Sequence, residues 1–451
     1  MKCILEEIPE EHRGRFTTIC VNSIPDEVSF VDGMVLILML IQMGRFRLDD
    51  STIDRIDFNL EKVEDVYDSD DDYESNWKYE IDLYDVHPKI DEDGRIIAFS
   101  IGRYFEQHRQ IPYDLPSCIV HLDRLEYLFV IDCRSLPAEA LPKLPNLRTL
   151  ELYFRDPSDL LNNFPLQMEL NQLKTLEICG GKFQPPAHFL EWMTTNLPNL
   201  ENLGFWHTEK KETERIIKAL STHDVCFAQT FKRLDIRACN LDDKLFESLL
   251  LDALPKFQSL STLNVVSNKI ESLQNIAKRI ENDNKKPCVV AKSLRHIYLT
   301  GNFVENKLKN NPKEKHAMLS LLKVFNAVCT LKIYGEEHFD SDVDYALRIN
   351  DAGRSLVEGG NDELLPLSVW PTVLERAYAE SHRAGLYLFR GIDSQEKNPT
   401  GLYYLLRNGP ALVSRSNLLG GSRYNDDGQD DENEKKDPKS RPNNNKRKRT
   451  A

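Results

Sequence analysis

A nine-residue pattern of apolar residues recurs through the middle of the chain, and it restricts the fold more than any other feature. Its clearest copy is LSTLNVVSN at residues 260–268, where Leu260, Leu263 and Val265 are apolar and Asn268 closes the block. Seven further copies begin at Leu125, Leu147, Leu173, Leu200, Phe231, Leu294 and Val328, and a fainter one begins at Ile96. Neighbouring copies begin 22 to 34 residues apart, a spacing typical of one strand followed by its return connection. We therefore expect a stack of similar units, each in contact with its neighbours.

The spacing inside each block predicts a β-strand. Because side chains alternate between the two faces of a strand, Leu263 and Val265 point to one face and Thr262 and Asn264 to the other. At the end of the strand, the Asn268 amide is placed to bond turn backbone groups that would otherwise be unpaired. Three other blocks hold an amide or a thiol at this position, namely Asn302, Cys133 and Cys239.

The connections between the later blocks have the pattern of amphipathic helices. Apolar residues recur at intervals of three and four in residues 245–253, 273–280 and 318–325, which predicts helices that pack on the back of the strands. The short unit at 125–146 contains Pro137, Pro142 and Pro145, so an irregular return is expected there.

Together the blocks resemble the leucine-rich-repeat family over about nine repeats in residues 96–338, and the later units are similar to ribonuclease inhibitor. The resemblance implies an α/β solenoid, a horseshoe in which a parallel sheet lines the concave face and helices cover the outside. A segment containing LRINDAGR, LPLSVWP, VLERA and LYYLLRNGPAL resembles the C-terminal segment of intracellular leucine-rich-repeat proteins of diatoms. That second resemblance does not imply any catalytic or binding activity.

The regions outside the repeats complete the predicted organisation. We expect an N-terminal region or cap at 1–95 with an acidic loop at 61–76, the solenoid at 96–338, a helical C-terminal capping segment at 339–420 and a disordered charged tail at 421–451. Within the capping segment, residues 345–360 are expected to contain one last strand.

The outward positions of nine adjacent strands predict a concave face about 40 Å across, wide enough for a protein partner. Aromatic and charged side chains are frequent there, and such residues anchor many protein interfaces. The predicted partner-binding residues are Tyr127, Phe129, Glu151, Tyr153, Glu177, Trp206, Arg233, Asp235, Arg237, His296, Tyr298, Lys332 and Tyr334. The alternative is that these residues only shield the sheet, and that the partner binds a loop or the convex side.

Composition argues against several other classes of protein. With 72 acidic and 58 basic side chains the net charge is -14, so a nucleic-acid partner and a membrane surface are not expected. The apolar run at 33–43 is shorter than the roughly 20 residues that a membrane span needs, and we expect it to be buried. The nine cysteines form no CxxC pair, which favours reduced thiols in an intracellular protein of the cytoplasm or nucleus.

The basic run KRKR at Lys446, Arg447, Lys448 and Arg449 indicates a nuclear-import signal. A solubilising tail is the alternative reading of the same residues.

No phosphate-binding, dinucleotide-binding, metalloprotease or serine-hydrolase motif is present in the sequence. We therefore expect a non-enzymatic scaffold for a protein partner, with no cofactor, metal or small-molecule substrate. Two alternatives stay open. One is a ubiquitin-ligase substrate receptor, because the sequence from Ser23 faintly resembles the start of an F-box. The other is a GTPase regulator, because repeats of the ribonuclease-inhibitor type also occur in such proteins.

Overall fold

The computed structural model describes residues 2–43, 48, 86–101, 113–131, 133–153, 168–180, 185–221, 224–282, 292–333, 341–354, 371–375, 378 and 404–407, and the structural statements below concern these residues. The acidic loop, the charged tail with its basic run, and Tyr334 lie outside them.

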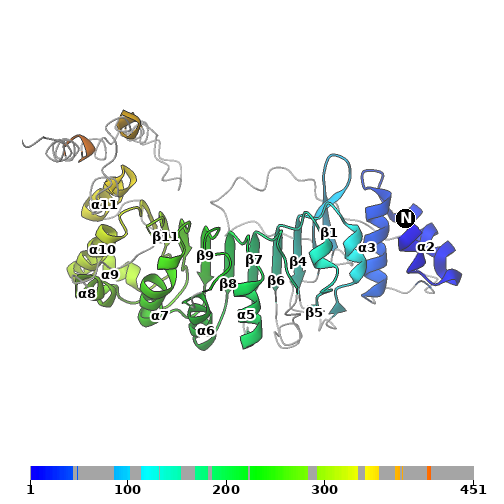
Figure 1. Ribbon diagram of the computed structural model, residues 1–451, viewed down its shortest axis with the longest axis horizontal. Coiled ribbons are helices and arrows are strands. Elements are labelled where there is room, and N and C mark those ends of the chain that lie inside the picture. The colour runs from blue at the N-terminus through cyan, green and yellow to red at the C-terminus, as the bar shows by residue number, and fades with distance from the viewer. Residues whose placement is uncertain are drawn as a thin grey trace, which may run out of the picture.

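A ten-stranded sheet forms the centre of the molecule (Figure 1). Nine of its strands are parallel and follow one another in space in the order of the chain. They are β2 (Ile96–Ile101), β4 (Tyr127–Ile131), β6 (Thr149–Tyr153), β7 (Thr175–Cys179), β8 (Asn202–Trp206), β9 (Arg233–Arg237), β10 (Thr262–Asn264), β11 (His296–Tyr298) and β12 (Thr330–Lys332). A separate two-stranded sheet joins β3 (Tyr113–Asp114) to β5 (Cys133–Ser135).

The register of the parallel strands matches the nine-residue pattern. Ala98 pairs with Tyr127, Tyr127 with Thr149, and Thr149 with Thr175, and the third residue of each later block is paired in the same way up to Thr330. The predicted parallel sheet, including the strand of the faint block at Ile96, is therefore confirmed.

The remaining strand, β1 (Val86–Ile90), pairs antiparallel with β2 at the N-terminal edge of the sheet. It is absent from the repeat pattern because it belongs to a hairpin and not to a repeat. At the hairpin turn Gly94 has a φ of 72°, and a Cβ there would lie 2.3 Å from the Glu27 carbonyl oxygen. Only glycine fits this contact between the hairpin and the N-terminal segment.

Three helices precede the sheet: α1 (Lys2–Glu6), α2 (Glu10–Ser23) and α3 (Phe30–Gln42). Every residue from Gly33 to Leu40 in α3 is buried, so the apolar run is a core helix, as expected. The buried Asp32 carboxylate accepts hydrogen bonds from the Ile96 amide at 2.8 Å and from Arg95 Nε at 3.0 Å. These bonds fasten α3 to the first parallel strand.

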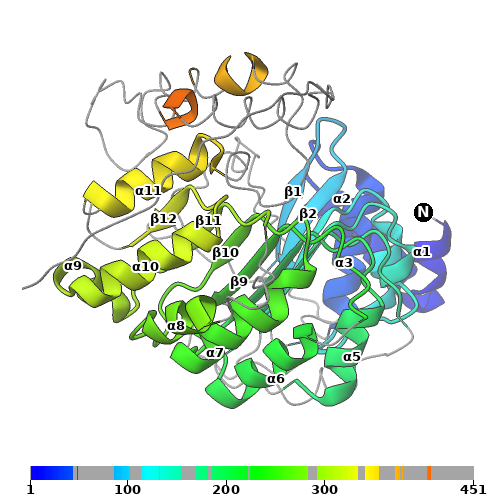
Figure 2. The same cartoon turned by 60° about the vertical axis from the view of Figure 1, so that its left-hand side comes forward.

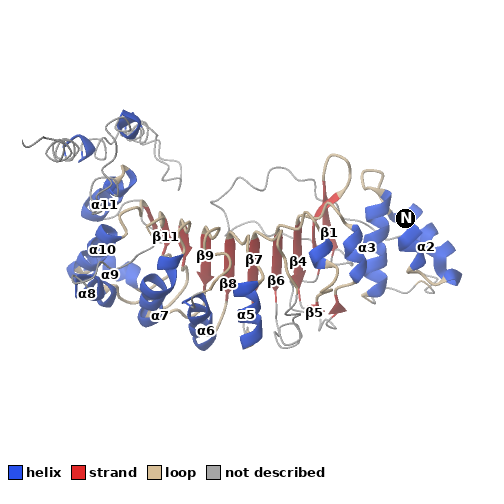
Figure 3. Cartoon of the chain, in the orientation of Figure 1, coloured by secondary structure: helices blue, strands red, loops and turns tan. Residues whose placement is uncertain are grey.

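Helices cover the outer side of the later repeats (Figures 2 and 3). They are α5 (Ala187–Thr195), α6 (Lys210–Ser221), α7 (Asp243–Ser248), α8 (Gln274–Asn282), α9 (Val304–Asn310) and α10 (Pro312–Val324). The three predicted outer helices are confirmed, and a π-helical segment, η4 (Leu249–Ala253), continues α7. In the described residues between β2 and β6, the helical segments are the short 3-10 turns η2 (Ser117–His121) and η3 (Leu141–Lys143).

The predicted last strand within 345–360 is wrong, because α11 (Ser341–Asp351) occupies the start of this region. The buried residues of α11 are Val343, Ala346, Leu347, Ile349 and Asn350. All of them except Ile349 follow the spacing of three and four that marks one helix face. The Asn350 amide donates to the carbonyl oxygens of Leu322 and Val328, which holds α11 against the last repeat.

Candidate functional site

The concave face is built from the outward side chains of the parallel strands. Its middle row follows the strand register and is here called the central row. From β4 to β12 it consists of Phe129, Glu151, Glu177, Gly204, Asp235, Asn264, Tyr298 and Lys332, each paired with the next. Strand geometry places neighbouring members about 4.8 Å apart. Charged groups on adjacent strands therefore interact directly.

All described members of the predicted site lie on this face, and Tyr334 lies outside the described residues. The aromatic and charged side chains are half-buried, whereas Asp235 is buried with 2% exposure. The regular alternation is clearest in β6 and β7, whose inward residues are buried and whose outward ones are half-buried. The strands therefore hold the outward groups in a fixed order while leaving part of each open to a partner.

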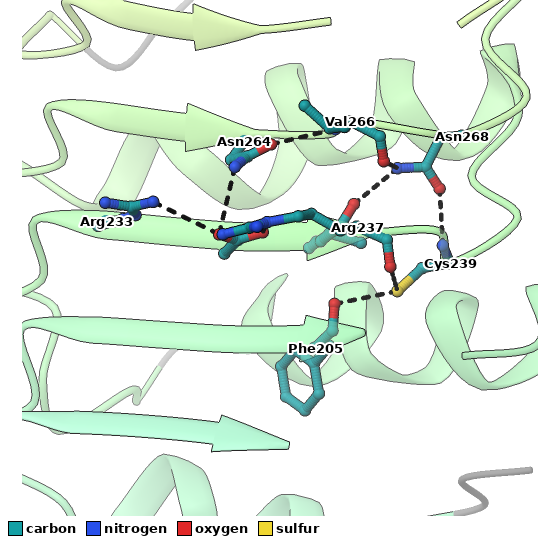
Figure 4. A network of polar contacts seen from close by, with 9 residues as sticks. Phe205, Arg233, Arg237, Cys239, Asn264, Val266 and Asn268 are labelled. Carbon is teal, nitrogen blue, oxygen red and sulfur yellow. Dashed lines mark hydrogen bonds and ion pairs between the residues drawn. The ribbon is translucent and has the colours of Figure 1, made fainter. Parts of the chain in front are cut away.

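Asp235 is the centre of a clamp on β9, and Figure 4 labels its partners Arg233, Arg237 and Asn264. Arg237 donates to its carboxylate from Nε at 2.8 Å and from Nη2 at 2.6 Å, and Arg233 Nη2 lies 3.6 Å from Oδ2. Asn264 Nδ2 donates to the same carboxylate at 3.3 Å. A two-point contact between guanidinium and carboxylate restricts the orientation of both groups, so Arg237 is held in place before any partner arrives.

Two cations on this face lie over aromatic rings. The Arg237 guanidinium carbon is 4.7 Å from the centre of the Trp206 ring, and Lys332 Nζ is 4.9 Å from the centre of the Tyr298 ring. Such stacking favours a cation and keeps its aliphatic stem against the sheet. The β9–β12 part of the face therefore presents its cations already paired with an acid or a ring.

The β6–β7 part of the face carries two carboxyl groups on neighbouring strands, Glu151 opposite Glu177. Burial, followed by the charges of Glu151 and Asp235, raises the pKa of Glu177 to about 8, against a smaller opposing effect of Arg237 and Arg233. Burial also raises the pKa of Glu151, which the hydrogen bond from Tyr127 partly offsets. Both side chains keep some solvent-exposed surface, but protein atoms of the concave sheet surround their carboxyl groups.

A glycine makes room for one of these carboxyl groups. Gly204 occupies the central-row position beside Glu177, and a Cβ on it would lie 3.2 Å from Glu177 Cγ and 3.4 Å from Cδ. The Glu177 side chain therefore lies over strand β8. It leans toward the charges of β9, which explains why Asp235 and both arginines affect its pKa.

Below the face, the predicted amides support the turns that follow the strands (Figure 4). Asn268 is buried; its Oδ1 accepts from the amides of Cys239 at 2.9 Å and Leu241 at 3.0 Å, and its Nδ2 donates to the Ile236 carbonyl at 2.6 Å. Asn302 bonds in the same way to Ile270 N, at 3.1 Å, and to the carbonyl of Val265, at 2.8 Å. The expectation that these amides bond turn backbone groups is confirmed.

Neither metal chemistry nor thiol chemistry is indicated in the part of the chain that the structure describes. No group of three or more His, Cys, Asp and Glu residues there is placed to hold a metal ion. Burial raises the pKa of Cys20, Cys133 and Cys239 to about 12, which keeps these sulfur atoms protonated and unreactive at neutral pH. Among the described helices, none has both the length and the apolar character to cross a membrane.

Two features of the site were missed by sequence reasoning. The clamp on Asp235 joins residues two apart on one strand, and the enclosure of Glu177 depends on the glycine of the next repeat. A signal for the second existed in the sequence, because Gly204 is a glycine at an outward strand position, where a side chain is usual. The first had no signal beyond the presence of opposite charges.

Comparisons with known proteins leave the family of this chain open. No protein-family model matches the sequence, and no curated protein matches it. Among solved structures, an internalin from Listeria monocytogenes is similar at 15% identity, with a TM-score of 0.29, over 55% of this chain and 61% of the internalin chain. The Mex67:Mtr2 subunits from Chaetomium are similar at 17% identity, with a TM-score of 0.20, over 31% of this chain and 78% of that one. These likenesses are too low to carry weight, and the leucine-rich-repeat-like fold follows from the strand register itself.

Proposed function

We propose that this protein is a non-enzymatic scaffold that binds a protein partner on its concave face. The observation that carries the proposal is the pre-formed cluster of Asp235, Arg237 and Trp206 near the middle of that face. Side chains already held in their binding orientation lose little conformational entropy when a partner binds. Arginine and tryptophan are also the residues most enriched among interface anchors.

The distribution of exposure supports the same reading. Half-buried aromatic residues occur on β4, β6, β8 and β11, so they flank the cluster on both sides. Nine parallel strands at a spacing of about 4.8 Å give a face roughly 40 Å across, which is adequate for a protein interface. If the side chains served only to shield the sheet, no need would exist for cations stacked on rings at its surface.

The test is a variant in which Trp206, Arg237 and Tyr298 are all replaced by alanine. Proximity labelling with the wild-type chain identifies the partner, and its binding to purified wild type and variant is then measured by calorimetry. We expect the variant to lose binding by at least a factor of 100. A control with K211A, E214A and K218A removes exposed residues of α6 and is expected to bind normally.

The triple variant leaves Asp235 buried with fewer partners, so its folding must be checked by thermal unfolding. A second variant, D235N with R237Q, removes the charge pair together and avoids an isolated buried charge. Binding by both variants at the wild-type level would contradict the proposal and favour a loop or the convex side.

The finer assignments belong to the same proposal. We infer that the repeats are of the ribonuclease-inhibitor type, that residues 1–95 and 339–420 cap the two ends, and that residues 421–451 form a charged tail. Localisation in the cytoplasm or the nucleus depends on whether residues 446–449 act as an import signal, which deletion of the tail tests. No described feature specifically favours a ubiquitin-ligase receptor or a GTPase regulator over a plain scaffold.

A further inference from the structure

The two halves of the concave face differ in charge balance. The outward positions of β4, β6, β7 and β8 include Glu151 and Glu177 but no lysine or arginine. On β9, in contrast, two arginines pair with Asp235. Strands β4, β6, β7 and β8 therefore supply no cation to the β6–β7 carboxyl groups, and the two arginines that act on Glu177 from β9 are already paired with Asp235.

Glu177 differs from the other enclosed carboxylates of the molecule. Asp32 bonds to Arg95 and to a backbone amide, and buried Glu314 accepts hydrogen bonds from Ser272, Leu273 and Gln274. Within the described ranges, no hydrogen bond or ion pair reaches the Glu177 carboxylate. An enclosed ionised carboxylate without a partner is costly, and the raised pKa of Glu177 reflects this cost. A cation brought from outside the chain would relieve the same cost.

Aromatic side chains surround the pair. Phe129 lies opposite Glu151 in the strand register, Tyr127 hydrogen-bonds to Glu151, and Trp206 follows Gly204 on the same face of β8. Tyr153 is the next outward residue after Glu151. Carboxylates between aromatic rings match a long cationic side chain, whose head binds the acid and whose stem packs on the rings.

We propose that Glu151 and Glu177 together bind one arginine or lysine side chain of the protein partner. This inference rests on the proposed function and adds the chemistry of the partner to it. The cation sits between two carboxyl groups on adjacent strands and relieves the repulsion between them.

Binding is then coupled to the release of a proton. Glu177 has a pKa of about 8 through burial and the charges of Glu151 and Asp235, so it is mainly protonated at pH 7. A bound cation favours the ionised form, and affinity rises with pH until the pH passes this value. Arg233, Asp235 and Arg237 on β9 also act on Glu177 through their charges, and burial raises the pKa of the Cys179 thiol on β7 to about 12, outside this range.

The test uses a defined probe, a fluorescein-labelled peptide of five Arg-Gly repeats, with a citrulline-Gly peptide as its neutral counterpart. Binding to the full-length chain is measured by fluorescence anisotropy at pH 6, 7, 8 and 9. We expect the arginine peptide to bind at least tenfold more tightly than the citrulline peptide. Its affinity should rise by between three- and tenfold for each pH unit up to pH 8.

The matched variants are E151Q with E177Q, and, as control, E191Q with E214Q, which alters two exposed acids on the outer helices α5 and α6. The first should lose at least tenfold in affinity together with the pH dependence, whereas the second should lose neither. Equal binding by wild type and the first variant overturns the inference, because the probe is then held by the general acidity of the chain.

The chain's own basic tail is the competing occupant. If deletion of residues 421–451 raises the affinity for the arginine peptide tenfold or more, the tail occupies the site and the partner inference is wrong. These outcomes are separate from the fate of the proposed function. Suppose that the variant of Trp206, Arg237 and Tyr298 loses partner binding while the E151Q and E177Q variant binds normally. The proposed scaffold function would then stand, and the proposed cation site would be rejected.

Discussion

Strands β4, β6, β7 and β8 are five residues long, whereas β10, β11 and β12 have three. A left-handed residue follows strands of both lengths, His207 and Ala238 after β8 and β9 and Ser267 and Gly301 after β10 and β11. What distinguishes β10 and β11 is the buried asparagine that comes next, because its side-chain amide bonds backbone carbonyl groups at the end of the strand. A side-chain amide at one fixed position thus replaces part of a strand. Within one repeat pattern, the backbone N–H and C=O groups are therefore paired in two ways, by strand–strand hydrogen bonds or by a side-chain amide.

The connections that follow the strands also differ between the early and the late repeats. The early returns contain the 3-10 turns η2 and η3, and the late ones the full helices α8 and α10. An α-helix with its side chains is about 10 Å wide, and strands are about 4.8 Å apart. Helical returns therefore need more room than the strands in front of them, and the late repeats must curve toward the concave side.

The largest loss of stability is expected from a change in the turns that follow the late strands. Replacement of Asn268 by alanine leaves the amides of Cys239 and Leu241 and the carbonyl of Ile236 without their partner. We expect a loss of about 3–5 kcal/mol in the free energy of unfolding, measured by urea denaturation. The exposed Asn199, which bonds only to the Asn171 carbonyl, is the control, and its alanine variant should lose less than about 1 kcal/mol. Equal losses would show that the buried amide has no special role.

The acidic half of the face is tested by replacement of Glu177 with glutamine. The pKa of this carboxyl is raised in the folded protein to about 8, so the native state binds more protons than the unfolded state and stability falls as pH rises toward 8. E177Q should therefore be more stable than wild type at pH 8, by about 1–3 kcal/mol, and near wild type at pH 4. Denaturation at both pH values checks this, with E191Q as the exposed control. A variant less stable than wild type at pH 8 would show that the carboxylate has a stabilising partner.

The smallest expected losses of stability come from alanine substitutions of two glycines, Gly301 in the late repeats and Gly204 in the early ones. Gly301 has a φ of 75° and an added Cβ would meet the Ser267 backbone at 3.2 Å, so G301A should cost about 1–2 kcal/mol. Gly204 would meet only the flexible side chain of Glu177, and G204A should cost less than about 1 kcal/mol. Thermal unfolding of both variants gives the order, and a larger cost for G204A would mean that the Glu177 side chain cannot move aside.

The local pattern of this sequence determined the repeats, the strand register and the outer helices. Period-2 blocks ending in an amide have only one face to bury, so the alternation alone assigns Leu263 to the core and Thr262 to the surface. The strand expected within residues 345–360 was wrong, because the buried face of α11 includes the polar residue Asn350, whose hydrogen bond to the Leu322 carbonyl depends on the tertiary structure.

Only the tertiary structure decided the chemistry of the concave face. The sequence places Glu151, Glu177, Gly204 and Asp235 in separate repeats, 26 to 31 residues apart, and nothing in their local spacing states which charges will be paired. Stacking of the repeats brought them into one row. Pairing depends on distances and burial across strands, and these exist only after the chain has folded. The row thus acquired a clamp on β9, in which the acid is paired with arginines, and two carboxyl groups on β6 and β7 that have no cation paired with them.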